Sequence, residues 1–359
     1  MKEKKKVTTR DIARECFVSQ SAVSMILSEK EGTHFSPETR KLVKETARKL
    51  GYEYTPRKTR KVTDMKSVIL IMCPSLATQY YTTLVQTITG KAQKMGLCTL
   101  TAHTDRSKER EEYYLKMAAD NSFYGVIYTY APKAQKMLNH LDGTMPLVLI
   151  NDHNPELKME LLELDSKKSG AMIARHLLEL GHKKIAYVTT PLSKMELPRR
   201  RRLLGMQEEW EKAGLDASFI KVLCEEKEDR ALSSGNQYYD TGFRLTRKYF
   251  EHPEGITAFA GTNDFVAIGI MDAITSLGFR IPKDYSVCGF DNTLVASFSG
   301  ISLTSIDHCI GEKGEYAVTM LESQHNSLRL KKNKNKPLIR LEYEPHLIAR
   351  NSTGPVCKK

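Results

Sequence analysis

Residues 8–28 have the sequence TTRDIARECFVSQSAVSMILS, and this stretch decides the fold of the N-terminal region. Thr9 suits the start of a short helix, because a threonine side chain can accept a hydrogen bond from the first free N–H groups. A turn at residues 17–18 follows, and Ser19 is expected to cap a second helix over residues 20–28. Both helices carry apolar residues at helical spacing. The residues on this apolar face are Ile12, Ala13, Cys16, Ala22, Val23, Ile26 and Leu27.

A third helix is predicted to begin at Ser36-Pro37, an N-cap followed by proline at the first helical position, and to end at Gly51. Two short helices joined by a tight turn, with a third packed across them, form a helix-turn-helix unit. In such a unit the second helix presents its N-terminal residues to base edges in DNA. The alternative is a three-helix bundle with another role. The exposed face of the second helix carries Gln20, Ser21, Ser24 and Met25.

The basic charge of the chain is concentrated at its N-terminal end. Residues 1–66 hold 17 basic and 9 acidic side chains, a net charge of +8, whereas the whole chain of 359 residues has a net charge of +12. A basic segment attached to a nearly neutral body is typical of proteins that bind a polyanion. The alternative for charge alone is a solvated surface.

From Ser67 onward, apolar runs typical of strands alternate with helical patterns, which predicts parallel sheets with crossover helices. The pattern restarts near Asp165, so we expect two similar α/β lobes. The predicted strands cover residues 68–73, 97–102, 126–130, 147–150, 184–188, 221–224, 258–260 and 285–289. The predicted helices cover residues 84–94, 108–120, 168–180, 201–213, 239–250 and 265–277.

Several runs of the chain closely resemble the lactose-repressor (LacI/GalR) family of transcriptional regulators. In the N-terminal region these are residues 7–13, 18–24, 36–40 and 50–52, the last of which is Leu50-Gly51-Tyr52. Further along they are residues 176–186, Thr262-Asn263-Asp264, Gly289-Phe290-Asp291-Asn292 and residues 345–353. They occur in the order and at the spacing of the family, and together they are highly specific.

The resemblance implies an N-terminal all-α helix-turn-helix head followed by an α/β, two-lobed, periplasmic-binding-protein-like sensor domain. We expect the head at residues 1–54, a basic linker at 55–66, the sensor at 67–353 and a tail at 354–359. The resemblance also implies that the chain crosses between the lobes three times, near residue 165 and within residues 295–340. A ligand would then bind in the cleft between the lobes, at the carboxyl ends of the strands.

The expected DNA contacts lie in the head and the linker. In the head they are Thr9, Ser19, Gln20, Ser21, Ser24 and Met25, and in the linker they are Lys58, Arg60, Lys61 and Val62. Three features depart from the family: Met25 replaces a common arginine, Phe17 stands where a small residue is usual, and the linker lacks the leucine wedge of the family's hinge helix. Val62 is the one plausible wedge in this linker, so we expect weak helix formation there without DNA.

The expected ligand contacts are Ser75, Tyr80, Tyr81, Arg202, Asn263 and Asp291. Asn263 and Asp291 follow predicted strands, and Arg202 is implied by the family's ligand-binding arginine, although Arg199, Arg200 and Arg201 compete for that role. Asp264 is more simply interpreted as a helix cap, and His176 as a packed helix residue. One of the two tyrosines could equally belong to the core.

We therefore expect a regulator, most simply a repressor, that binds a pseudo-palindromic DNA operator as a homodimer. A small molecule, with a sugar or sugar derivative as first choice, would control the affinity for the operator through the cleft. Two alternatives stay open: control by a protein partner, and control by a purine corepressor. An enzyme fused to a DNA-binding head is a further alternative, but the chain has no GxGxxG, GxxxxGK[ST], HExxH or GxSxG motif.

The cysteine pattern and the apolar runs exclude further classes. Seven cysteines are scattered without CxxC spacing, so neither a zinc site nor a disulfide framework is predicted, and no cofactor is expected. No apolar run approaches the roughly 20 residues that span a bilayer. The basic N-terminus lacks a following apolar segment, unlike a signal peptide. We expect a soluble cytoplasmic protein without a membrane partner.

Overall fold

A computed structural model describes residues 7–27, 35–52, 65–152, 159–192, 197–225, 236–329 and 338–357. The chain divides into two compact units, Met1–Thr63 and Asp64–Lys359. The predicted linker contacts Lys58, Arg60, Lys61 and Val62 lie outside the described residues, as does most of the basic stretch 329–336.

The first unit contains the three predicted helices, α1 (Thr9–Glu15), α2 (Gln20–Leu27) and α3 (Pro37–Lys49). Ile12, Val23, Ile26 and Val43 are fully buried between them, as the apolar spacing predicted. The Ser36 hydroxyl accepts a hydrogen bond from the Thr39 N–H at 3.2 Å and caps α3. The unit is therefore a small helical bundle closed by one apolar cluster.

The caps of the first two helices differ from the prediction in one respect. Thr8, not Thr9, is the N-cap of α1, and its N–H and hydroxyl both donate to the Asp11 carboxylate, at 2.9 and 2.7 Å. Thr9 is released from capping, and its hydroxyl accepts from Gln20 Nε2 at 3.1 Å. Ser19 caps α2 as predicted, since its Oγ accepts from the Ala22 N–H at 3.1 Å.

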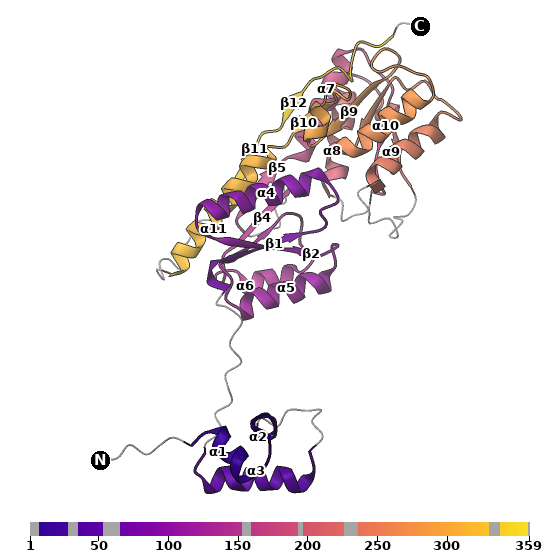
Figure 1. Ribbon diagram of the computed structural model, residues 1–359. Helices are drawn as coiled ribbons and strands as arrows, with labels where there is room; N and C mark the ends of the chain where they lie inside the picture. Colours follow the sequence, from indigo (N-terminus) through magenta and orange to yellow (C-terminus); the bar gives the residue numbers. More distant parts are fainter. Residues whose placement is uncertain are drawn as a thin grey trace. The chain divides into compact units, whose positions relative to one another are not determined.

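The second unit is built on two six-stranded sheets (Figure 1). The sheet of the N-terminal lobe has the order β11-β5-β4-β3-β1-β2, and all of its strands are parallel. The sheet of the C-terminal lobe has the order β12-β10-β9-β8-β6-β7, in which β12 is antiparallel to β10. The strands are β1 (Val68–Cys73), β2 (Cys98–His103), β3 (Gly125–Tyr128), β4 (Leu147–Asp152), β5 (Leu161–Leu164), β6 (Ile185–Val188), β7 (Ile220–Leu223), β8 (Ala258–Gly261), β9 (Ser286–Phe290), β10 (Thr304–Asp307), β11 (Arg340–Tyr343) and β12 (His346–Ile348).

Helices cover both faces of each sheet (Figure 1). In the N-terminal lobe α4 (Gln79–Lys94) and α11 (Ile310–Arg329) share one face, and α5 (Lys108–Asp120) and α6 (Gln135–Leu141) share the other. In the C-terminal lobe the two pairs are α7 (Ser166–Glu179) with α8 (Leu197–Lys212), and α9 (Asn236–Tyr249) with α10 (Asp264–Ser276). Short 3₁₀ turns cover Met65–Ser67, Ala217–Phe219 and Leu294–Ser297.

The order of the strands shows where the chain passes between the lobes. It leaves the first sheet after β5, returns after β10 through α11, and leaves again between β11 and β12. The first two of these passages lie at residues 164–166 and 307–310, and the third lies at residues 343–346. In the described part of the chain, three segments therefore connect the two lobes.

Glycines at the α7–α8 contact bring the two helix backbones unusually close. A Cβ added at Gly170 would lie 1.9 Å from the Arg202 carbonyl oxygen, and one added at Gly205 would lie 2.0 Å from the Lys167 carbonyl oxygen. No larger residue fits at either position without moving a backbone. This packing fixes the height of α8 on the sheet, and with it the position of Arg202.

Candidate functional site

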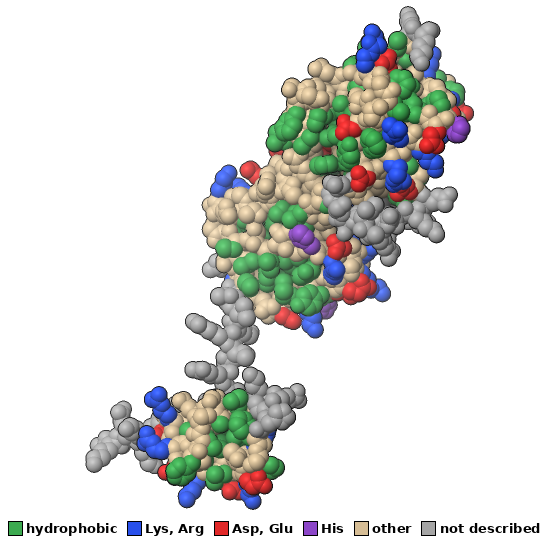
Figure 2. Space-filling model, turned by 45° about the vertical axis from the view of Figure 1, so that its right-hand side comes forward, with side chains coloured by type: hydrophobic (Ala, Val, Ile, Leu, Met, Phe, Trp, Pro, Cys, Tyr) green, Lys and Arg blue, Asp and Glu red, His purple; other side chains and the backbone are tan. Residues whose placement is uncertain are grey.

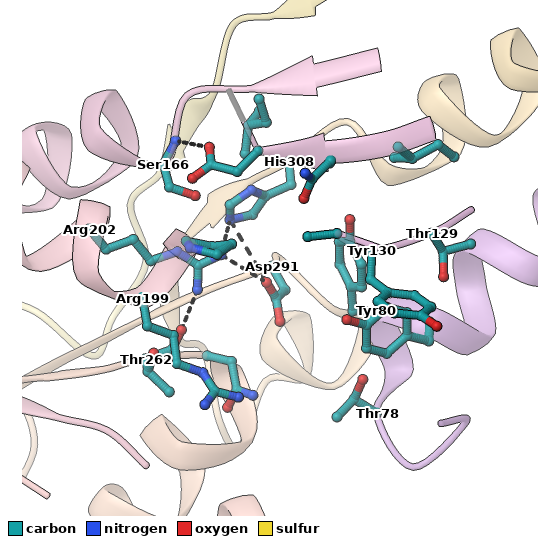
Figure 3. Close-up of a pocket in the computed structure, with 18 of the residues that line it drawn as sticks. Thr78, Tyr80, Thr129, Tyr130, Ser166, Arg199, Arg202, Thr262, Asp291 and His308 are labelled. Atoms are coloured by element: carbon teal, nitrogen blue, oxygen red, sulfur yellow. Dashed lines mark hydrogen bonds and ion pairs between the residues drawn. The ribbon is translucent and has the colours of Figure 1, made fainter. Parts of the chain in front are cut away.

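A cavity of about 140 Å³ lies between the two lobes, at the carboxyl ends of their strands (Figure 3). Thr129 and Tyr130 follow β3, Thr262 follows β8, Asp291 follows β9 and His308 follows β10, and all of them line it. Polar residues gather here because parallel strands end at one edge of their sheet, where the next loop begins. The cleft is therefore lined by side chains from both lobes.

Arg202, Asp291 and His308 form the polar centre of the cavity wall on the C-terminal lobe (Figure 3). Arg202 Nη2 lies 3.8 Å from Asp291 Oδ1 and 3.5 Å from His308 Nε2, and its Nη1 donates to the Thr262 carbonyl oxygen. The guanidinium also stacks over the Phe290 ring, 4.6 Å from its centroid. These contacts hold the planar fork of Arg202 in one orientation, while its Nε has no hydrogen-bond partner among the described residues.

Burial controls the charges of this centre. The pKa of Asp291 is raised to about 7, mainly by burial. The charge of Arg202 lowers this pKa, and the nearby Asp264 contributes to the rise. Burial also lowers the pKa of His308 well below its usual value, and the Arg202 charge acts in the same direction. His308 is therefore neutral near pH 7, so its Nε2 accepts from Arg202 and does not form an ion pair with Asp291. The Asp291 carboxyl can either donate or accept a hydrogen bond at neutral pH.

The sequence suggested that Asp264 caps α10, but the structure gives that role to its neighbour Asn263. The helix cap is Asn263, whose Oδ1 accepts from the Val266 N–H at 2.9 Å while the residue also lines the cavity. The expectation that Asp264 caps the helix is wrong. Asp264 is fully buried and accepts from the Thr293 N–H at 2.7 Å and the Ser305 hydroxyl at 2.5 Å. It thereby fixes the loop after β9 that carries Asp291.

Tyr80 and Tyr81 lie in the first turn of α4, because that helix begins at Gln79 and not at residue 84. Their rings meet edge to face, 5.0 Å apart at 87°, and both line the cavity. Tyr81 accepts from Arg106 Nη2 at 3.2 Å. The N-terminal lobe therefore offers aromatic rings opposite the charged centre of the other lobe.

Ser75 does not line the cavity, unlike the other five expected ligand contacts. Its hydroxyl accepts from the Ala77 N–H at 3.0 Å and stabilises the turn after β1. The hydroxyl thus bonds within its own loop, and the residue stands outside the wall of the cavity. His176 also lies outside the cavity and bonds Thr353 Oγ1 at 2.9 Å.

The four consecutive arginines at the start of α8 have different surroundings. Arg199 and Arg202 line the cavity. Arg201 instead bridges Asp152 Oδ2 at 3.3 Å and Asp165 Oδ1 at 2.7 Å, and so ties α8 to the end of β4 and to the first passage between the lobes. Arg200 is exposed.

Of the expected DNA contacts of the head, Thr9 lies in α1 and the other five lie in α2 or at its N-cap. Gln20, Ser21 and Ser24 are exposed, whereas Met25 is half-buried. Ser19 is exposed but its hydroxyl is occupied by capping, 3.0 Å from the Ser21 hydroxyl. Gln20 reaches back to Thr9. The amide of Gln20 and the hydroxyls of Ser21 and Ser24 are the polar groups that this helix offers to a base edge.

Comparisons with known proteins agree with this architecture. Residues 174–353, half of the chain, match the family described as periplasmic binding protein-like domain. The HTH-type transcriptional regulator DegA of Bacillus subtilis is 25% identical over 355 residues, which cover 98% of this chain and 99% of DegA. The chain belongs to the LacI family of transcriptional regulators.

Two solved structures of LacI-type proteins share the fold. A LacI family regulator from Enterococcus faecium with bound ribose superposes with a TM-score of 0.68 at 20% identity, covering 81% of this chain and 100% of that one. The lac repressor dimer bound to operator and the anti-inducer ONPF superposes with a TM-score of 0.66 at 23% identity, covering 98% and 100%. Head and sensor thus occur together in a known protein of this family.

The cavity of this LacI-family chain also contains residues that sequence reasoning missed. Thr78, Asn151 and Lys313 line it. Asn151 stands near the carboxyl end of a predicted strand, the same signal that selected Asn263. Lys313 falls on the apolar stripe of α11 between Ile310 and Ala317, and a charge on such a stripe is the signal that could have found it. Thr78 carried no signal, because the start of α4 was predicted too late.

Among the described residues no helix is long and apolar enough to cross a membrane. In the same part of the chain, no group of three or more His, Cys, Asp or Glu side chains could hold a metal ion.

Proposed function

We propose that this LacI-family regulator is a repressor whose affinity for its operator is set by a hydroxyl-bearing small molecule, a sugar or sugar derivative, bound in the cleft. The observation that carries the proposal is a set of buried polar atoms without partners. Thr78 Oγ1 and Asn151 Nδ2 from the N-terminal lobe, and Arg202 Nε from the C-terminal lobe, have no hydrogen-bond partner among the described residues. An unsatisfied buried polar group costs about 1–3 kcal/mol, so a ligand that bonds all three would be bound firmly.

A sugar fits this mixture of groups. Adjacent hydroxyls can bond the fork of Arg202 and the Asp291 carboxyl at once, and Tyr80 or Tyr81 can cover an apolar face of the ring. The ribose-bound E. faecium regulator, which has the same fold, supports this choice. A purine is the second candidate, since the same aromatic rings could stack on a base.

Coupling to DNA would follow from the three segments that connect the lobes. Arg201 joins α8 to Asp152 and Asp165, so a ligand that draws the lobes together acts on a segment that is already cross-linked. Whatever change the effector makes in operator affinity, the operator must make in effector affinity. The molecule would work by binding, and we expect no turnover of the effector.

We propose that the protein binds a pseudo-palindromic operator as a homodimer, because one head makes few contacts and two-fold symmetry doubles them. The lac repressor, bound to its operator as a dimer, supports this arrangement. Gln20 and Ser21 would contact base edges, and the linker residues Lys58, Arg60 and Lys61 would contact phosphates.

The test is a thermal-unfolding screen of sugars, sugar derivatives and purines on the full-length protein, followed by calorimetry. A ligand at 100 times its Kd should raise the free energy of unfolding by about 2.7 kcal/mol. Asp291→Ala and Arg202→Ala should each weaken binding of that ligand about tenfold or more, because each leaves a buried partner unsatisfied. Arg200→Ala is the matched control, since Arg200 is exposed. Wild-type affinity in both cleft variants would show that the ligand binds elsewhere.

A further inference from the structure

Lys313 is buried in the wall of the cleft, and its ammonium has no hydrogen-bond or ion-pair partner among the described residues. Lys313 lies in the first turn of α11, lines the cavity and is 2% exposed. It makes no hydrogen bond or ion pair with any described residue, and its Nζ lies over the Tyr80 ring, 5.7 Å from the centroid. A buried charge without a hydrogen-bonded partner is costly, and such groups are retained mainly where a ligand needs them.

The charged groups around the cavity have an excess of positive charge. Four cationic side chains line it, Arg106, Arg199, Arg202 and Lys313, against the carboxylates of Asp152 and Asp291. Asp152 is already paired with Arg201, and burial raises the pKa of Asp291 to about 7, so neither carboxylate fully offsets the cations. On the face drawn in Figure 2, by contrast, basic and acidic side chains are interspersed on the C-terminal lobe.

The N-terminus of α4 adds to this positive end of the cavity. Thr78 is the N-cap of this 16-residue helix, it is buried, and its hydroxyl makes no hydrogen bond with any described residue. A helix N-terminus carries a partial positive charge and free N–H groups, which suit an anion. Tyr80, whose ring Lys313 covers, lies two residues further along the same helix. Thr78 and Lys313 thus both line the cleft, and Lys313 packs against a residue in the first turn of the helix that Thr78 caps.

We propose that the effector carries an oxyanion, a phosphate ester or a carboxylate, which is bound by Lys313 together with Thr78 at the N-terminus of α4. Arg202 and Asp291 bind the hydroxyls of the same molecule from the opposite lobe. This inference rests on the proposed function and narrows the effector to an anionic sugar derivative. An oxyanion supplies the acceptors that the Lys313 ammonium and the Thr78 hydroxyl lack.

The experiment measures binding to the full-length protein by calorimetry and by the shift in Tm, with glucose, glucose 6-phosphate, gluconate and inorganic phosphate as probes. Inorganic phosphate and at least one of the two anionic sugars should raise Tm, and that sugar should bind at least tenfold more tightly than glucose. Preference for glucose 6-phosphate would indicate a phosphate ester, and preference for gluconate a carboxylate.

Lys313→Met should weaken binding of the preferred anionic probe at least tenfold, whereas Lys313→Arg should retain most of it. Lys116→Met, at an exposed position of α5, is the matched control and should change nothing. Lys313→Met should also raise the Tm of the effector-free protein, because an unpaired buried charge is removed. A lower Tm would indicate a structural role for Lys313 and would overturn the inference.

Two further outcomes separate this inference from the proposed function. If glucose binds as tightly as its anionic counterparts, or if Lys313→Met keeps wild-type affinity for them, the oxyanion subsite is wrong and the sugar-binding cleft stands. If none of the four probes binds at about 10 mM, the oxyanion subsite is overturned. If the wider screen of neutral sugars and purines also fails, the cleft is not an effector site and both proposals fall.

Discussion

In the head the polar side chains of α2 point to solvent, whereas in the sensor the polar side chains of the cleft are buried between two lobes. Gln20, Ser21 and Ser24 are exposed, so water satisfies their hydrogen bonds when no DNA is present. Thr78 and Lys313 are buried, and the Thr78 hydroxyl lacks a hydrogen-bond partner among the described residues. The exposed polar groups of the head therefore cost little folding free energy in the absence of DNA. The buried polar groups of the cleft lower the stability of the protein until a ligand binds.

The largest effect is expected at the close contact between α7 and α8, which positions Arg202 in the wall of the cleft. Gly170→Ala should lower the free energy of unfolding of the sensor by about 3 kcal/mol or more, because its Cβ would collide with the Arg202 backbone. Effector affinity should fall as well, since Arg202 must move. Denaturant unfolding and calorimetry measure the two effects.

Gly90→Ala is the matched control, because Gly90 also lies in a helix but no atom lies within 4 Å of its added Cβ. It should be neutral or stabilising by up to about 1 kcal/mol. Equal effects of the two substitutions would contradict the argument from close packing.

The cost of the buried ammonium should be visible as a dependence of stability on pH. Burial lowers the pKa of Lys313 from its usual 10.5 to about 8, and the charge of Arg202 acts in the same direction. The opposing effect, which raises this pKa, comes from Cys309, Asp291 and Asp152. Between these two pKa values the unfolded chain binds more protons than the folded one, so stability should rise with pH from about 8 to 10.5. Lys313→Met should remove this rise and add up to about 3 kcal/mol below pH 8, at 1.36 kcal/mol per unit of pKa shift.

Denaturant unfolding at several pH values measures this slope. Lys116→Met, with an exposed side chain, should keep the wild-type slope. A steep slope that persists in Lys313→Met would assign the effect to another group and weaken the contrast between head and cleft.

In the head we expect a change of specificity without a change of stability. Gln20→Ala should weaken operator binding by about 1–3 kcal/mol and alter the preferred base, while the Tm of the protein stays near wild type. Selection from a randomised operator and fluorescence anisotropy measure both. Removal of Lys58 should instead reduce the salt dependence of binding and leave the sequence preference intact. An unchanged base preference in Gln20→Ala would exclude Gln20 from direct readout.

The smallest effect is expected at the turn between α1 and α2. Phe17 is 96% exposed and has a φ of 53°, which an L-residue adopts at a cost of about 1 kcal/mol. Phe17→Gly should therefore stabilise the head by roughly 1 kcal/mol, as measured by hydrogen exchange in α1 and α2 of the full chain. Phe17→Ala is the control, because it removes the exposed ring but keeps a side chain at the positive φ. It should not increase the stability of the head.

The three helices of the head and most strands of the sensor could be predicted because they depend on local patterns. The apolar spacing around Ile12, Val23 and Ile26 and the caps at Ser19 and Ser36 act within a few residues of the chain. Thr8 could have been preferred to Thr9 as the cap, because only Thr8 stands three residues before Asp11, the spacing of a capping box. The elements after residue 290 were not predicted individually, because they cross between lobes and their partners are distant in the sequence.

The sequence by itself determined the family, the two kinds of domain and five of the residues that line the cleft, because motifs and strand ends are local features. The tertiary structure alone decided which polar groups are left without partners. Ser75 lies outside the wall of the cavity and its hydroxyl bonds its own turn, and Asp264 holds a neighbouring loop and not a helix end. Lys313 enters the cleft because α11 returns to the first lobe after β10 and packs beside α4. Burial and charge balance arise from such distant contacts, so no local pattern could assign them.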